Sequence, residues 1–333
     1  MQTTSVLIQS LCVPCLNRCR YCLLSWNGGV EGAPWARSVR LAERWLRELK
    51  EQQPGIRASF AFGCSMEHPA LREALRILRR LGSPMADFLQ CDGMKMRNED
   101  ECGALMALLK EEGIRQLNFT VYGLPDYHDR FAGRKGDHAL ILRMMRAAGN
   151  AGIPFDAGLP LTAENAGQID GAAALLEDAG CAKIHLFIPH EEGRGRSLAA
   201  VRCSRKDLEK LSPASRSRLN EGFFRTEAEW IKDAGAYHEE KRQILLSLRA
   251  DNIDRYEETD ALSALRETEA LDEAYYAAFP GFADLAKQYG DPEGGRLYGI
   301  RDLFAHYRSL YAAEHGIRVY DVTDERFSGS RRS

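Results

Sequence analysis

The chain has 333 residues, of which 44% are hydrophobic and 28% charged, and a formal net charge of -3. This balance is ordinary for a soluble globular protein and gives no reason to expect binding to nucleic acid or to a membrane surface. No apolar run reaches the roughly 18 residues that a transmembrane helix needs. The first ten residues lack a basic segment followed by a long apolar run, so we expect no signal peptide.

Nine cysteines are present, an odd number, and four of them fall within residues 12–22. The other five are spread along the chain: Cys64, Cys91, Cys102, Cys181 and Cys203. A secreted scaffold held by disulfides would carry an even set at regular spacing, whereas a metal site in a reducing compartment uses a short cluster. We therefore expect a cytoplasmic protein with a metal site.

Short β-rich runs alternate with amphipathic helical stretches over residues 4–189. The strand-like runs are 5–9, 58–62, 86–91, 116–122, 154–160 and 183–189. Leu41, Trp45 and Leu49 are spaced four apart on one face of the first predicted helix. Three later helices are each followed by a glycine of the kind that ends helices: Gly113, Gly152 and Gly180. The pattern predicts an α/β fold with a parallel sheet, open or closed, whose ligands gather at the carboxyl ends of the strands.

After about residue 200 no further β/α alternation is visible, and the sequence becomes charged and helical. One β-like run follows at 317–322, and the tail at 328–333 is predicted to be disordered. We expect residues 1–200 to form the α/β domain and residues 201–327 a mostly helical region.

Cys15, Cys19 and Cys22 form a Cys-x3-Cys-x2-Cys run directly after the first predicted strand. Three closely spaced thiolates can hold three corners of a [4Fe–4S] cluster and leave one iron open for chemistry. A zinc site using all four clustered cysteines is the alternative, but its two pairs would be cramped. A ferredoxin-type cluster would need Cys12 as a fourth ligand.

This loop, with Tyr21 before its last cysteine, resembles the signature of the radical S-adenosylmethionine (SAM) superfamily. The resemblance covers about residues 4–200 and implies a partial (β/α)6 barrel, with the C-terminal region covering its mouth. It also implies that the open iron binds SAM and that one electron from the cluster cleaves it. The resulting 5′-deoxyadenosyl radical abstracts a hydrogen atom from the substrate.

The resemblance implies a SAM site at the ends of several strands. After the second strand, the backbone of relatives binds the methionine amino group, and this chain has Gly63, Cys64 and Ser65 there. Cys64 and Ser65 replace the usual second Gly and the Glu, so Glu67 is either a shifted partner or the start of a helix.

Further contacts are implied by the fourth and sixth strands. Thr120 is the expected ribose contact, and Phe187 and Ile188 are expected against the adenine. Arg130 or Arg134 would pair with the methionine carboxylate, because relatives often carry Arg where this chain has Ala132; either could equally be a solvated loop charge.

Cys91 and Asp92 end the third strand, where they would face the substrate. A thiol there could donate a hydrogen atom to a product radical, or Cys91 could be a buried small hydrophobic residue.

No cysteine follows Cys203, so a second cluster is not expected. The favoured function is a radical SAM enzyme with one [4Fe–4S] cluster and SAM, reduced by an external donor such as flavodoxin or ferredoxin. It would act on a small molecule or short peptide, in a redox-neutral modification of a natural product or metabolite. The alternatives are a maturase of ribosomally made peptides, a non-catalytic iron–sulfur electron carrier or redox sensor, and a zinc-stabilised interaction module.

Overall fold

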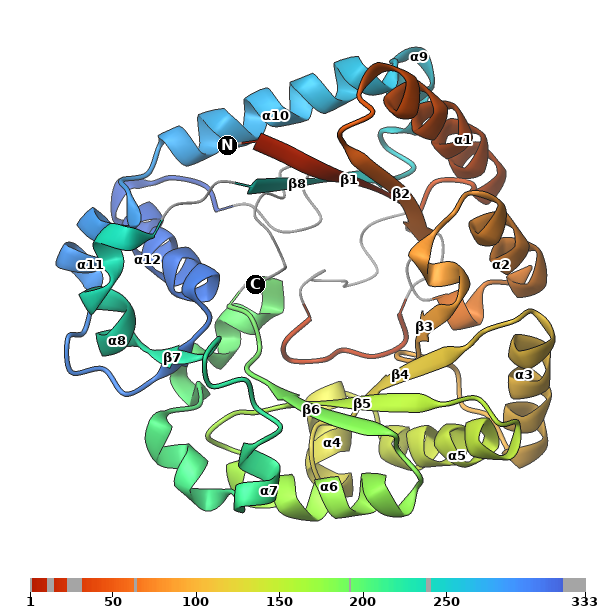
Figure 1. The fold of residues 1–333 in the computed structure, drawn as a ribbon, viewed down its shortest axis with the longest axis horizontal. Coiled ribbons are helices and arrows are strands. Elements are labelled where there is room, and N and C mark those ends of the chain that lie inside the picture. Colours follow the sequence, from red (N-terminus) through yellow and green to blue (C-terminus); the bar gives the residue numbers. More distant parts are fainter. Residues whose placement is uncertain are drawn as a thin grey trace.

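The computed structural model describes residues 2–10, 15–22, 32–62, 65–191, 193–237 and 241–319. No helix in these ranges is both long and apolar enough to cross a membrane. The strands form two parallel sheets and one short antiparallel pair, with helices around the outside (Figure 1).

All six predicted strands are present: β1 (Gln2–Ser10), β2 (Arg57–Phe62), β3 (Phe88–Gln90), β4 (Gln116–Thr120), β5 (Phe155–Pro160) and β6 (Lys183–Phe187). Four of them form a parallel sheet in the order β3-β4-β5-β6, and β1 and β2 belong to a second sheet. The two sheets lie around an incomplete ring (Figure 1), as expected for a partial barrel.

The helices between these strands cover the outside of the ring: α1 (Trp35–Gln52), α2 (Leu71–Arg80), α3 (Glu99–Glu111), α4 (Pro125–Ala132), α5 (Asp137–Asn150) and α6 (Ile169–Asp178). Short 3-10 helices connect elements: η1 (Ser65–Glu67), η2 (Pro84–Ala86), η3 (Ala166–Gln168), η4 (Gly193–Val201), η5 (Arg205–Lys210) and η6 (Ala234–Ala236). The predicted apolar face of α1 is confirmed, because Leu41, Trp45 and Leu49 are all buried.

The C-terminal region contains a strand that the sequence did not reveal. β8 (Lys241–Leu248) pairs in parallel with β1, which gives the order β2-β1-β8. It is followed by α9 (Ile253–Glu258) and α10 (Ala261–Ala277), and the Trp45 indole of α1 donates to the carbonyl of Thr259 between them at 3.1 Å. The expectation that β/α alternation ends near residue 200 is therefore wrong. Only residues 244–248 of β8 form an apolar run, which is short and follows charged sequence, so its pairing with β1 defines the strand.

The remaining elements are α7 (Pro213–Arg216), β7 (Arg225–Thr226), α8 (Glu227–Lys232), α11 (Phe282–Tyr289), β9 (Leu297–Tyr298) and α12 (Ile300–His315). Of these, α8, α11 and α12 lie between β6 and β8 (Figure 1) around a second apolar cluster that includes Phe282, Leu285 and Tyr307, whereas α7 contacts α6. The expected strand at 317–322 is absent from residues 317–319, and its remainder and the tail lie outside the described residues.

Candidate functional site

The cysteine loop, residues 15–22, follows β1 and is fixed by backbone hydrogen bonds to three other segments. The Leu16 N–H donates to the Gly93 carbonyl after β3 at 3.1 Å. The Arg18 N–H donates to the Ala132 carbonyl at the end of α4 at 2.7 Å, and the Arg194 N–H donates to the Cys22 carbonyl at 3.0 Å. The loop is therefore held from β1, from the ends of β3 and α4, and from the segment after β6.

Gly93 forms a close cradle for the first thiol of the loop. A Cβ atom on this residue would lie 2.1 Å from Cys15 Sγ, and its φ of +63° is one that residues with side chains rarely adopt. No other residue type fits here without moving the thiol. The close contact with Gly93 therefore fits a thiol whose position must be fixed, as in a metal ligand.

Of the three thiols of the loop, Cys19 is buried, and Cys15 and Cys22 are partly exposed. Burial raises the pKa of Cys19 to about 12, and the neighbouring charges of Cys15 and Cys22 raise it further, whereas a hydrogen bond with Tyr122, whose Oη lies 3.0 Å from Sγ, lowers it. No three His, Cys, Asp or Glu side chains among the described residues are arranged to share one metal ion. A [4Fe–4S] cluster sets no such requirement, because each thiolate binds a different iron. The donor set thus fits this cluster.

Tyr21 of the cysteine loop lies among aromatic rings from three different segments. Its ring centroid is 5.7 Å from that of Tyr122, 5.9 Å from Phe131 and 6.1 Å from Phe187. Phe187 ends β6, and the next residue, Ile188, is buried. The structure therefore brings the expected adenine contacts next to the cysteine loop.

A buried network of hydrogen bonds centred on Asp137 contacts the cysteine loop through Asn17. Asn17 Nδ2 donates to Asp137 Oδ2 at 3.0 Å. His128 accepts the Tyr122 N–H at Nδ1, so its Nε2–H donates to the same carboxylate at 3.1 Å. Burial would raise the pKa of Asp137, but the hydrogen bonds from His128 and Arg134 outweigh it and lower the pKa.

Arg134, one of the two candidates for the methionine carboxylate, belongs to this network. Its guanidinium donates to Asp137 and to the carbonyl of Met94. In this structure it ties the segment after β3 to the start of α5.

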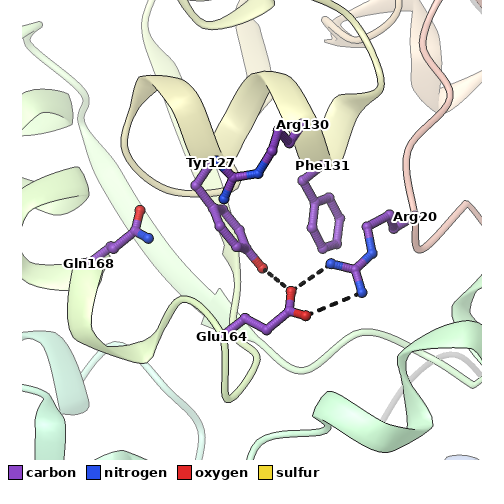
Figure 2. Close-up of a pocket in the computed structure, with 6 residues that line it drawn as sticks. All are labelled: Arg20, Tyr127, Arg130, Phe131, Glu164 and Gln168. Atoms are coloured by element: carbon purple, nitrogen blue, oxygen red, sulfur yellow. Dashed lines mark hydrogen bonds and ion pairs between the residues drawn. The ribbon is translucent and has the colours of Figure 1, made fainter.

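Arg130, the other candidate, lies on α4 and lines a pocket of about 280 Å³ (Figure 2). Its guanidinium lies 5.7 Å from the ring centroid of Tyr127. Across the pocket, Glu164 pairs with Arg20 of the cysteine loop at 2.5 Å and accepts a hydrogen bond from Tyr127 at 3.2 Å. This pocket opens beside the loop.

The carboxyl ends of β3 and β4 meet at Asp92 and Thr120. Asp92 Oδ2 accepts from Gln90 at 2.7 Å and from the Thr120 hydroxyl at 3.2 Å. Burial raises the pKa of Asp92 to about 6, against the lowering effect of these hydrogen bonds. The Cys91 side chain is fully buried in the main core, as in the hydrophobic alternative for this residue.

Part of the expected methionine site, Gly63 and Cys64, lies outside the described residues, and of Ser65 only the backbone is described, at the start of η1. Glu67 forms a two-pronged ion pair with the buried Arg97, at 2.6 and 3.0 Å. It thus binds the segment after β3.

Four residues that support the loop were not anticipated: Gly93, Asn17, Tyr122 and Asp137. Only Gly93 carried a local signal, as a glycine directly after a predicted strand end. The others are ordinary polar residues until the fold brings them under the cysteines.

Residues 11–176 match the sequence model of the family described as "Radical SAM superfamily". No curated protein matches this sequence.

Several solved structures resemble the fold at low sequence identity. SuiB of Streptococcus suis, bound to its precursor peptide SuiA, has a TM-score of 0.49 and 13% identity over 74% of this chain and 58% of its own. Coproporphyrinogen III oxidase (HemN) of Escherichia coli has a TM-score of 0.44 and 12% identity over 74% of this chain and 63% of its own. The structure titled "Native anSMEcpe with bound AdoMet and Cp18Cys peptide" has a TM-score of 0.40 and 15% identity over 57% of this chain and 52% of its own. The chain thus spans less than two thirds of the length of each of these proteins.

Proposed function

Because the chain belongs to the radical SAM superfamily, whose cofactors are a [4Fe–4S] cluster and SAM, we propose that Cys15, Cys19 and Cys22 hold this cluster and that the enzyme cleaves SAM reductively at it. The single observation that carries the proposal is the loop itself: three thiols at Cys-x3-Cys-x2-Cys spacing in the segment after β1, with Gly93 closed against the first. When bound, the cluster and SAM supply a 5′-deoxyadenosyl radical that takes a hydrogen atom from the substrate.

The protein's own residues hold and shield this chemistry. Four backbone hydrogen bonds fix the loop, namely the three given above and one from the Arg20 N–H to the Phe131 carbonyl at 3.1 Å. The rings of Tyr122 and Phe187 pack against Tyr21 of the loop and are proposed to help exclude water there. Thr120, 5% exposed at the end of β4, is the proposed ribose contact, and its hydroxyl is oriented by Asp92. The backbone around Gly63, Cys64 and Ser65 is proposed to bind the methionine amino group.

The proposed substrate is a small molecule or a short peptide, modified without net oxidation. This rests on the single group of clustered cysteines, since no cysteine follows Cys203 that could hold an additional cluster as electron acceptor. The electron for the first step is proposed to come from an external carrier of the flavodoxin or ferredoxin type. We propose a natural product or metabolite as the substrate and the cytoplasm as the location.

Anaerobic reconstitution of the full chain tests this proposal. We expect a brown protein with about four irons, a change in the EPR spectrum of the reduced cluster on adding SAM, and 5′-deoxyadenosine formed with dithionite. Cys19→Ser is expected to lose the cluster, while the matched control Cys181→Ser, at a partly buried thiol remote from the loop in sequence, keeps it. A colourless protein with stoichiometric zinc, or a reduced cluster indifferent to SAM, would contradict the proposal.

A further inference from the structure

Exposed side chains beside the cysteine loop combine large apolar groups with cations. Leu16 and Met96 are 45% and 49% exposed, and they are two of only six large apolar side chains exposed among the described residues. Three exposed basic residues accompany them: Arg18, Lys95 and Lys135. We call these five residues the rim face.

Contacts between three segments make the rim face continuous. Leu16 is bonded through its backbone to Gly93, which lies two residues before Lys95. A Cβ on Gly136 would lie 3.0 Å from Met96 Cε, and one on Gly133 would lie 2.8 Å from the Cβ of Arg18. These two glycines stand on either side of Lys135, so the cysteine loop, the segment after β3 and the segment after α4 touch one another.

The positive charge of the rim face is not neutralised within the described part of the chain. None of its three cations forms an ion pair there, whereas the neighbouring buried Arg97 is paired with Glu67. The nearby Glu164 is already paired with Arg20. Exposed carboxylates in the first turn of α3, Glu99 and Asp100, follow Met96 in the sequence and mark where the positive charge ends.

An apolar centre with a charged surround is the usual composition of a docking surface, and its charge selects the partner and speeds encounter. Leu16 and Arg18 lie between Cys15 and Cys19 in the sequence, so a protein bound here contacts the loop that bears the thiols. A cationic surface selects an acidic partner.

We propose that the rim face docks an acidic one-electron carrier protein of the flavodoxin or ferredoxin type, which reduces the cluster held by this loop. The inference rests on the proposed function and adds to it the place where the electron enters. In the transfer the carrier loses one electron and the oxidised cluster gains it, with no bond made or broken and no proton moved.

The test compares two reductants of the reconstituted holoenzyme by stopped-flow absorbance under anaerobic conditions. In the double variant Lys95→Glu/Lys135→Glu, we expect reduction by a fully reduced bacterial flavodoxin to slow at least about tenfold at low ionic strength. Reduction by dithionite should stay within about twofold of the unaltered enzyme, because a small ion needs no docking surface. Added salt should slow the flavodoxin reaction of the unaltered enzyme and leave that of the variant nearly unchanged.

Arg47→Glu/Lys50→Glu is the matched control, since both residues are exposed on α1, across the ring from α4 (Figure 1). This variant should keep the unaltered rate with flavodoxin. Met96→Ser tests the apolar centre without a change of charge and should slow the flavodoxin reaction at every ionic strength.

An unchanged flavodoxin rate in Lys95→Glu/Lys135→Glu would overturn the proposal, as would an equal loss with dithionite, which would show damage to the cluster loop. Failure of the proposed function has a different signature. It would appear as a reduced cluster that forms no 5′-deoxyadenosine from SAM, whichever reductant is used.

Discussion

The two parallel sheets of the barrel are built in different ways. Each strand of the β3-β4-β5-β6 sheet pairs with its neighbour in the sequence, through a connection that contains a helix. The β2-β1-β8 sheet instead takes its third strand from beyond the whole four-stranded sheet in the chain.

The two sheets accordingly contribute different parts of the site. The three-stranded sheet carries the cysteine loop, which leaves its central strand β1. The four-stranded sheet supplies the surroundings of that loop: Gly93 after β3, Tyr122 after β4, Glu164 after β5 and Phe187 at the end of β6. The thiols therefore depend on both sheets. The three-stranded sheet holds the strand from which the loop starts, and the four-stranded sheet supplies the residues that position the loop.

The largest expected effect comes from loosening either sheet. Leu246 on β8 and Leu159 on β5 are both fully buried, so Leu246→Ala and Leu159→Ala should each cost about 2–5 kcal/mol of unfolding free energy in urea titrations. Iron should be lost to a chelator faster in Leu246→Ala, because β8 pairs with β1 along its length. Equal rates of iron loss in both variants would contradict the conclusion that the cysteine loop depends most directly on the three-stranded sheet.

A pH-dependent effect should come from Asp92, where the four-stranded sheet faces the loop. Burial raises its pKa from 3.8 to about 6, so the charged form destabilises the apo-protein. The carboxyl is protonated in both the folded and unfolded chain below about pH 4, and stability is lost as the pH rises through 6. Asp92→Asn should therefore gain up to about 3 kcal/mol relative to the unaltered protein between about pH 4 and pH 8. Urea unfolding of both apo-proteins across this range measures it, and a constant difference between them would contradict the prediction.

Alanine substitutions at two glycines with the same backbone conformation can distinguish the effect of backbone strain from that of a steric contact with Cys15. Gly82 and Gly93 have φ of +65° and +63°, but a Cβ on Gly82 meets nothing within 4 Å, whereas one on Gly93 meets Cys15 Sγ. Gly82→Ala and Gly93→Ala should each lose about 1–2 kcal/mol from backbone strain. Only Gly93→Ala should also lose iron after reconstitution, measured as iron per chain. A full iron content in that variant would show that the cradle is not needed.

The smallest effect is expected at the pocket of Figure 2, where Arg20 of the loop meets Glu164 after β5. Both side chains are partly exposed, so Glu164→Gln should change the unfolding free energy by less than about 1 kcal/mol and leave the iron content unchanged. A large loss of iron would show that side-chain pairing, rather than the backbone bonds of the loop, holds the thiols.

Much of the four-stranded sheet was readable from the sequence because its contacts are local. Its strands β3, β4 and β5 are each followed by an α-helix, and glycines such as Gly113 follow the ends of such helices with positive φ. The cysteine spacing was likewise readable, since it lies within one loop. β8 was not, because a short apolar run in charged sequence becomes a strand only when β1 is beside it.

Sequence alone thus determined the alternating fold, the three-cysteine loop and its place at a strand end, because these follow from spacing along the chain. Tertiary structure decided what surrounds that loop. It committed Arg134 and Glu67 to partners within the protein, placed Arg130 in the pocket that Arg20 and Glu164 line, and buried Cys91. The physical reason is that the partner of a charged or thiol group is a neighbour in space, and the residues that meet at this rim come from the ends of separate strands.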